Sequence, residues 1–184
     1  EWGDRVTANF DIASYAISTA RQTDAGATIS GASVTLSPPA ADRGYTYSEQ
    51  VTVTATAPPG WRFREWRGAL NGTTNPATLT VTDDALVAAV FEPIYYRVRL
   101  ETVGQGRVDI TPPEEAAGYR YGESVTITAQ AAAGWRFLRW DGDLSGIENP
   151  AMLIVTGEMD VTAVCVPVAG QLFLPFVVRE RSTP

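Results

Sequence analysis

The stretch Gly60-Trp61-Arg62-Phe63 returns 74 residues later as Gly134-Trp135-Arg136-Phe137. The flanking sequence returns with the same offset, and roughly half of the positions from Val34 to Phe91 are identical to those from Val108 to Cys165, without a gap. Self-similarity at one fixed spacing predicts two copies of a single structural unit. Because repeated modules usually build surfaces and spacers, the duplication favours a structural protein over an enzyme.

Each copy consists of short runs of β-branched and aromatic residues that alternate with polar ones and are broken by glycine and proline. This alternation is typical of strands with one buried face. In the second copy it predicts strands at residues 96–100, 108–111, 124–130, 135–140, 152–155 and 160–166. No window of helical length has a 3.6-residue period, so helix should be scarce. We therefore expect an all-β fold of tandem small antiparallel modules, each about 75 residues long.

The tryptophans leave one ambiguity in this strand pattern. Strict alternation places Trp61 and Phe63 on one face of their strand. Trp66 then falls on the opposite face, unless a β-bulge shifts the alternation between them. The position of Trp66, and of Trp140 in the second copy, therefore depends on a bulge.

The repeat divides the chain into four segments. Residues 15–93 and 94–168 are the two expected β modules. Residues 1–14 are interpreted as the closing strand of a preceding, truncated repeat, because Arg5–Phe10 is similar to Leu86–Phe91. Residues 169–184 form a C-terminal tail, expected to be a packed strand followed by a disordered end.

The composition limits the chemistry that the chain can perform. All 14 basic residues are arginine and histidine is absent, so the usual general base near neutral pH is missing. We therefore expect no catalytic activity and no cofactor. A net charge of −7 disfavours nucleic acid or an anionic membrane as partner. Arg62, Arg64 and Arg67 lie close in sequence to Glu49 and Glu65, which indicates a solvated strand face.

Two further features have simple interpretations. The single cysteine, Cys165, occupies the place of Phe91 in the first copy, which predicts a core position rather than a reactive thiol. Residues 161–178 carry no charge, but prolines and a glycine interrupt them. We therefore expect no membrane insertion.

The second copy combines Gly106, Val108, Pro112, Tyr119, Gly122, Val125, Thr126, Thr128, Ala129, Gly134, Trp135, Phe137, Trp140, Gly142, Asn149, Pro150, Val161, Thr162, Ala163 and Val164. In this combination the chain resembles the divergent internalin B-type (InlB B-repeat-like) repeat of bacterial surface and secreted proteins, with two copies and the tail of a third. Two positions depart from the family pattern: Ser48 replaces a glycine, and Cys165 replaces the closing aromatic residue.

The resemblance implies a small β-rich fold similar to the β-grasp form of the related internalin repeats. It also implies a non-catalytic role in large extracellular proteins, as spacers, stalks or adhesive modules. The family has no catalytic residues to transfer to this chain. We accordingly expect structural or adhesive modules at the C-terminus of a secreted or cell-surface bacterial protein.

One loop offers a weak candidate for a calcium site. Asp141, Asp143 and Glu148, with Ser145, could supply oxygen ligands. The first copy has Arg67, Ala69, Thr74 and Asn71 at these places, which cannot form an equivalent site. A solvated turn is the alternative, and any calcium would bind only to the second copy.

Repeated aromatic residues offer a candidate for glycan binding, with Trp66, Trp140, Tyr47 and Tyr121 stacking on sugar rings. Packing in the core explains the same residues equally well. The alternative function is therefore a carbohydrate-binding module, and a third is an accessory region of an extracellular enzyme. The corresponding partners are a cell-wall or extracellular polysaccharide, or another surface protein.

Overall fold

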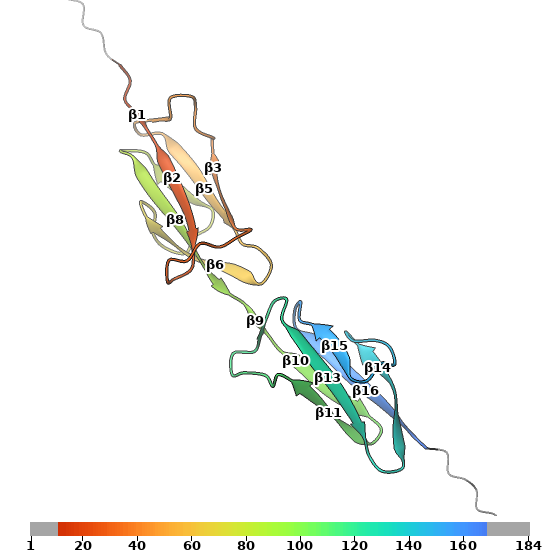
Figure 1. Ribbon diagram of the computed structural model, residues 1–184. Coiled ribbons are helices and arrows are strands. Elements are labelled where there is room, and N and C mark those ends of the chain that lie inside the picture. Colours follow the sequence, from red (N-terminus) through yellow and green to blue (C-terminus); the bar gives the residue numbers. More distant parts are fainter. Residues whose placement is uncertain (1–10, 169–184) are drawn as a thin grey trace, which may run out of the picture. The chain divides into compact units, whose positions relative to one another are not determined.

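The computed structural model describes residues 11–168 and contains two units, divided between Tyr95 and Tyr96 (Figure 1). We call them module 1 and module 2. The expected strand at Arg5–Phe10 and the expected tail at 169–184 lie outside the described residues. Every regular element between residues 11 and 168 is a strand, which confirms the all-β fold. Within this range no helix is long and apolar enough to span a membrane.

Module 1 contains two three-stranded sheets and one short strand pair. Its strands are β1 (Ser14–Tyr15), β2 (Ile17–Gln22), β3 (Ser33–Ser37), β4 (Tyr45–Thr46), β5 (Gln50–Thr56), β6 (Trp61–Gly68), β7 (Ala77–Thr80) and β8 (Ala85–Pro93). The sheet orders are β2-β8-β6, β3-β5-β7 and β1-β4.

Module 2 repeats this arrangement. Its strands are β9 (Tyr95–Tyr96), which spans the division, then β10 (Val98–Val103), β11 (Gly106–Thr111), β12 (Tyr119–Arg120), β13 (Ser124–Ala131), β14 (Trp135–Gly142), β15 (Ala151–Ile154) and β16 (Met159–Pro167). The sheet orders are β10-β16-β14, β11-β13-β15 and β12-β9. The strands predicted from the alternation are all present.

Most strand pairs are antiparallel, as expected, but each module also contains one parallel pair. β2 runs parallel to β8, with Ile17 opposite Ala85 and Gln22 opposite Val90. β10 runs parallel to β16 in the same way. The first and last long strands of a module are therefore neighbours, an arrangement that alternation along one strand cannot reveal.

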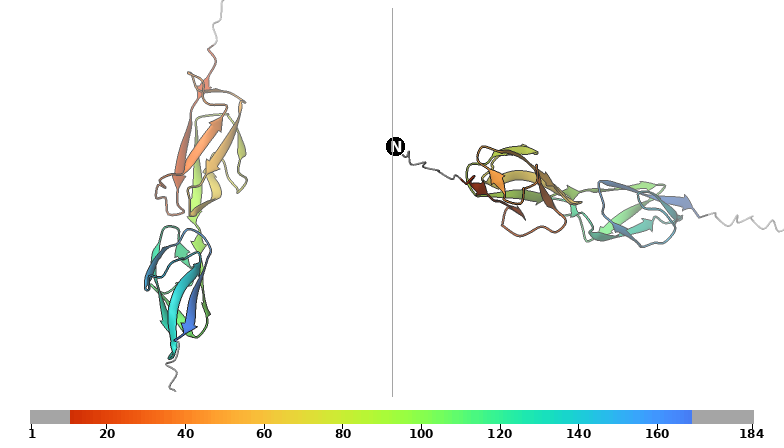
Figure 2. Two further views of the ribbon diagram at one scale, coloured as in Figure 1. Left: turned by 90° about the vertical axis from the view of Figure 1, so that its right-hand side faces the viewer. Right: turned by 90° about the horizontal axis from the view of Figure 1, so that it is seen from above.

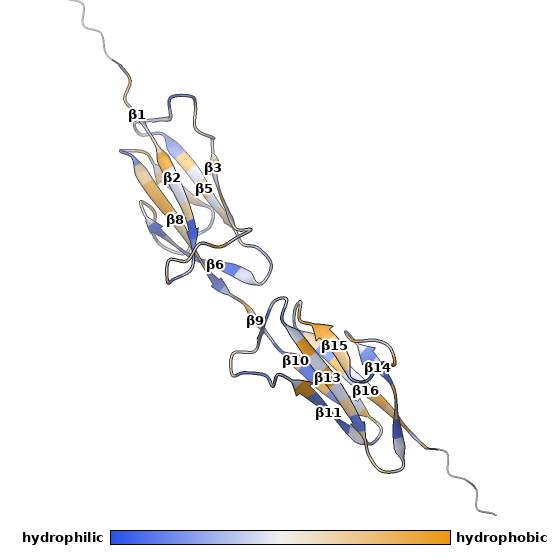
Figure 3. Cartoon of the chain, in the orientation of Figure 1, coloured by the Kyte–Doolittle hydropathy of each residue, from blue (hydrophilic) through white to orange (hydrophobic). Residues whose placement is uncertain are grey.

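The two three-stranded sheets of each module lie face to face around a separate core (Figure 2). Alternate residues of the last strand point inward: Val87 and Ala89 have no exposed surface and Phe91 has 1%. This strand is coloured as hydrophobic in Figure 3. In module 2, Cys165 is 3% exposed at the place of Phe91, which confirms its position in the core.

A β-bulge determines the positions of Trp66 and Trp140, which occupy equivalent places in the two modules. The register of β6 against β8 shifts between Phe63 and Glu65, so Trp66 turns to the same side as Phe63. Their ring centroids lie 4.9 Å apart. Module 2 has the same shift between Phe137 and Arg139, and Phe137 and Trp140 are again 4.9 Å apart.

The two modules differ most in the connection between their first two long strands. Ile17 of β2 corresponds to Val98, 81 residues later, whereas Ser33 of β3 corresponds to Arg107, 74 residues later. Between these equivalent positions module 1 therefore has seven more residues than module 2. Ile29 and Ala32 of this longer loop are 5% and 3% exposed, so the insertion contributes to the core.

Ser48 is the one position between residues 11 and 168 where a residue other than glycine has positive φ, at 66°. Gly122, with φ of 80°, occupies the equivalent place, and a Cβ there would meet nothing within 4 Å. The free-energy cost at Ser48 therefore comes from its left-handed backbone conformation and not from a clash with neighbouring atoms. We expect Ser48→Gly to raise the free energy of unfolding of module 1 by about 0.5–1 kcal/mol. Gly122→Ser should lower that of module 2 by a similar amount, and urea denaturation measures both.

Candidate functional site

Two of the four aromatic residues predicted to bind glycan are buried. Trp66 and Trp140 are each 1% exposed. Their indole N–H groups donate to the carbonyl oxygens of Thr74 and Glu148, at 2.9 and 2.8 Å. The bulge turns these rings into the core, so neither can stack on a sugar, and that part of the prediction is wrong.

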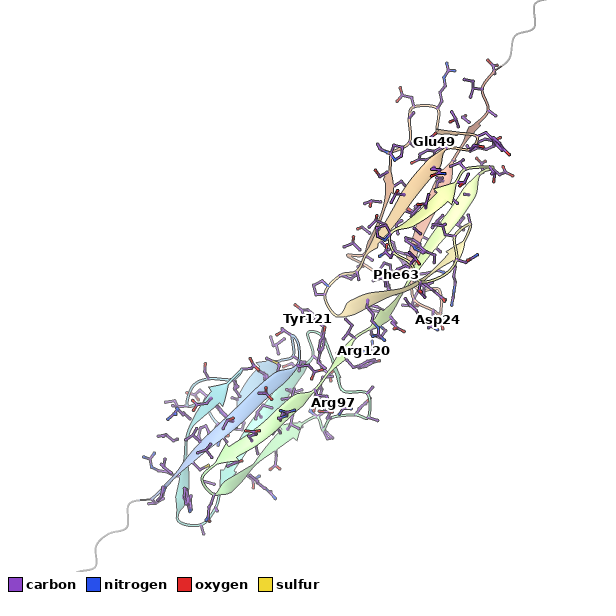
Figure 4. The ribbon with its side chains drawn as sticks, turned by 180° about the vertical axis from the view of Figure 1, so that it is seen from behind. Asp24, Glu49, Phe63, Arg97, Arg120 and Tyr121 are labelled. Atoms are coloured by element: carbon purple, nitrogen blue, oxygen red, sulfur yellow. The ribbon has the colours of Figure 1, made fainter. Side chains whose placement is uncertain are left out.

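The other two candidates, Tyr47 and Tyr121, are 64% and 44% exposed. Tyr47 lies in the turn that precedes β5, and Tyr121 lies in the turn that precedes β13. In module 1 the Glu49 carboxylate closes this turn by accepting a hydrogen bond from the Thr46 N–H at 2.9 Å. Glu123 accepts from the Arg120 N–H at the same distance in module 2. Glu49 and Tyr121 are labelled in Figure 4. Each module thus presents one tyrosine on a closed turn.

The tyrosines two positions earlier have a different role. Tyr45 and Tyr119 are 1% and 2% exposed, and their hydroxyl groups donate to the carbonyl oxygens of Pro38 and Pro112, at 3.0 and 2.7 Å. Burial raises the pKa of both, and neighbouring carboxylates, beginning with Glu49 and Glu114 respectively, raise it further. Both rings therefore anchor the loop that follows β3 in module 1 and β11 in module 2.

The acidic loop does not bring its carboxylates together. Asp141 accepts two hydrogen bonds from Arg139, which is the main reason that its pKa is lowered. Asp143 accepts from the Asp160 N–H at 2.8 Å, and the carbonyl of Glu148 accepts from Trp140. Between residues 11 and 168 no three acidic, cysteine or histidine side chains are grouped so as to hold a metal. The proposed calcium ligands thus belong to separate local contacts.

The arginines of β6 pair with a residue that the sequence did not indicate. Asp24, in the longer loop of module 1, contacts Arg67 closely and lies 3.5 Å from Arg64 (Figure 4). Arg62 pairs with Glu92 at 2.6 Å. Glu65 also pairs with Arg67, as its position suggested, whereas Glu49 closes its own turn instead. The arginine face is solvated, and its pairs tie the inserted loop to β6.

The hydrogen bond from Arg67, followed by the charge of Arg64, lowers the pKa of Asp24 below its ordinary value of 3.8. A carboxylate with a depressed pKa stabilises the folded state above its unfolded pKa, and this contribution disappears as pH falls through the folded value. We expect Asp24→Asn to lower the melting temperature of module 1 slightly at neutral pH and to lose this effect as pH falls below the folded-state pKa of Asp24. Asp141→Asn is the matched variant in module 2. A difference that persists in strong acid would contradict this linkage.

Among the described residues, module 2 has a hollow at each of two places. One, of about 360 Å³, is lined by Arg97, Val98, Arg99, Glu114, Glu158, Met159 and Asp160. The other, of about 560 Å³, is lined by Gly104, Gln105, Gly106, Arg107, Gln130, Ala131 and Ala132. The second lies at the β10–β11 connection, where module 1 carries its seven extra residues. It therefore reflects a difference in loop length between the copies.

The exposed faces of the β3-β5-β7 and β11-β13-β15 sheets also differ. In module 2, Met152 and Ile154 of β15 are 72% and 55% exposed. Module 1 has Thr78 and Thr80 at these places, both exposed. The core of the module therefore does not require apolar residues here, and the surface has diverged while the fold has not.

Sequence reasoning missed the role of the repeated Asn-Pro pair. The Asn75 side chain accepts from the Ala55 N–H at 2.9 Å and donates to the Ala55 carbonyl at 2.8 Å. Asn149 makes the same two bonds to Ala129, at the same distances. The amide thus extends the ladder of hydrogen bonds beyond the edge strand. The return of Asn-Pro in both copies was the available signal, but its partner lies 20 residues away.

Two copies of one two-sheet module, each closed around its own core, define a tandem-repeat protein. A family model described as the divergent InlB B-repeat domain matches residues 16–95 and again residues 96–168. The chain therefore belongs to this family, as the sequence motifs predicted. No curated protein and no solved structure matches the chain.

Proposed function

We propose that the two modules are non-catalytic structural units of a secreted or cell-surface bacterial protein, and that they act as spacers. One observation carries this proposal: the contacts that recur in both copies are internal to the module. They are the buried indole N–H bonds, the tyrosine hydroxyl bonds and the asparagine bonds to the ladder. The exposed face of the β3-β5-β7 sheet differs from that of the β11-β13-β15 sheet, and Arg64 and Arg67 of β6 correspond to Leu138 and Asp141 of β14. Apart from the turn tyrosines, duplication has thus preserved a building unit rather than a surface.

The association of this family with bacterial surface proteins supports the proposed location. An adhesive role, and a position at the C-terminus of the parent protein, are parts of the same proposal. In this view the modules hold a neighbouring region away from the cell, with each module folding around its own core.

An exchange of modules in the parent protein tests the spacer function. Residues 96–168 are replaced by a second copy of residues 16–95, and the accessibility of the parent protein to added protease is measured on intact cells. A spacer should tolerate the exchange, because length and fold are kept. Loss of surface accessibility after this exchange would contradict the spacer function, whereas loss of cell adhesion alone would show that the adhesive role depends on a specific surface of module 2.

The second candidate is glycan binding, and the exposed tyrosines are the observation that favours it. Tyr47 and Tyr121 are exposed aromatic residues at equivalent positions on closed turns. If they bind sugar, Tyr47→Ala combined with Tyr121→Ala should abolish retention of the chain on insoluble cell-wall polysaccharide. Each single variant should lose most of the avidity. Absence of retention by the unsubstituted chain would remove this candidate.

A further inference from the structure

The two ends of each module belong to neighbouring strands that run in the same direction. In module 1 the chain enters the β2-β8-β6 sheet through β2 and leaves it through β8, and these strands pair in parallel over six positions. In module 2 the chain enters through β10 and leaves through β16, again paired in parallel over six positions. Both copies therefore join their entry strand directly to their exit strand.

This pairing determines how a module responds when its ends are pulled apart. The start of β2 and the end of β8 lie at opposite ends of the pair, because the strands are parallel. A force applied through the chain therefore slides one strand along the other. The evenly spaced hydrogen bonds between them are then all loaded at the same time. If the force were applied at one end of the pair, the bonds would instead open one after another.

The exit strand is also the most protected strand of the module. β8 is the central strand of its sheet, with β2 on one side and β6 on the other. Four successive residues of β8, from Val87 to Val90, are at most 7% exposed. Water therefore has little access to these hydrogen bonds from the β8 side, whereas β2 is the edge strand of the sheet.

We propose that each module is a mechanical clamp, in which the parallel pair of entry and exit strands resists tension along the chain. This inference rests on the proposed spacer function and specifies its physical task. A spacer at a cell surface transmits whatever force acts on the region that it carries. The duplication places one clamp in each module, so the modules resist tension in series.

The backbone of β10 identifies a substitution that weakens the clamp. The Met159 N–H donates to the carbonyl of Arg97 at 3.0 Å, so the backbone groups of Arg97 face β16. Successive residues of a strand direct these groups to opposite sides. Glu101 therefore faces β16 with its backbone, and Thr102 faces away from it. Glu101 has an exposed side chain, so proline at this position removes a clamp bond with little loss of packing.

Single-molecule force spectroscopy on the full chain, held by its two ends, tests the clamp. We expect two separate unfolding events, each releasing about 25 nm of chain. Glu101→Pro should raise the rate of forced unfolding of module 2 by about tenfold at a fixed force and leave module 1 unchanged. Thr102→Pro, the matched control on the same strand, should have a smaller effect. Equal effects of the two prolines would overturn the clamp.

The direction of pulling provides a second test. Cysteines introduced by Gln105→Cys and Val168→Cys attach the handles just beyond the ends of β10 and β16, which lie at the same end of the parallel pair. Module 2 should then unfold at a lower force than when it is pulled through its ends. Equal forces in the two geometries would refute the clamp while leaving the spacer proposal intact. A single merged event for both modules would instead refute independent spacer modules.

Discussion

Trp140→Ala is expected to unfold module 2 at a much lower temperature while module 1 keeps its own transition. Trp140 is 1% exposed, it packs against Phe137, and its N–H bonds the Glu148 carbonyl. Truncating such a residue costs about 3–5 kcal/mol. A module of this size has a total stability of about 4–11 kcal/mol. The substitution therefore removes a large part of what holds module 2 together.

The measurement is a thermal melt of the full chain followed by far-ultraviolet circular dichroism. Trp140→Ala should split the melt into two steps, because the two cores share no residues. Trp66→Ala should produce the same split, with module 1 as the weaker unit. Trp140→Phe keeps an aromatic ring but leaves the Glu148 carbonyl without its donor, so it should cost about 1–3 kcal/mol. A joint shift of both steps after Trp140→Ala would show that the modules unfold as one.

Most of the fold could be predicted because the duplication tests each strand twice. The run Val51–Ala55 alternates between buried and more exposed side chains, and so does its copy at Val125–Ala129. Because both copies show the same alternation at the same offset, the sequence indicates a strand fold twice and argues against a helical one. Cys165 could be placed in the core for the same reason, since the other copy has Phe91 there.

The parts that could not be predicted depend on contacts between distant segments. Alternation indicates which face of β2 is buried, but it does not show that β8 is its parallel neighbour. The position of Trp66 depended on a bulge, and the free energy of forming that bulge is determined by the packing of the whole sheet. Asp24 lies in a loop that only one copy has, so the repeat offered no comparison for it. The candidate site was harder than the fold, because exposed residues differ between the copies.

Asn149→Ala is expected to destabilise module 2 more than any other substitution of an exposed residue considered above. The side chain of Asn149 satisfies both the N–H and the carbonyl of Ala129, which is 6% exposed. Without the amide, both backbone groups lose their partner at the edge of the core. Each such group costs about 1–3 kcal/mol, so we expect a loss of about 2–4 kcal/mol in the free energy of unfolding.

Urea denaturation of the full chain measures this loss, and neighbouring substitutions separate its causes. Glu148→Ala is the control, because the structure uses only the backbone carbonyl of this exposed residue. Asn149→Asp keeps the size of the side chain and still accepts from the Ala129 N–H, but an ionised carboxylate cannot donate to the carbonyl. Its destabilisation should therefore shrink in acid, where the new carboxyl group is protonated and can donate. If Asn149→Asp were harmless at neutral pH, the bond to the carbonyl would contribute nothing.

The repeat allows the asparagine to be tested twice in one molecule. Asn75 makes the same two bonds to Ala55, so Asn75→Ala should cost module 1 what Asn149→Ala costs module 2. The two cores share no residues, and the effects in the double variant should therefore add. A substantially smaller effect in module 1 would contradict the equivalence of the two asparagines.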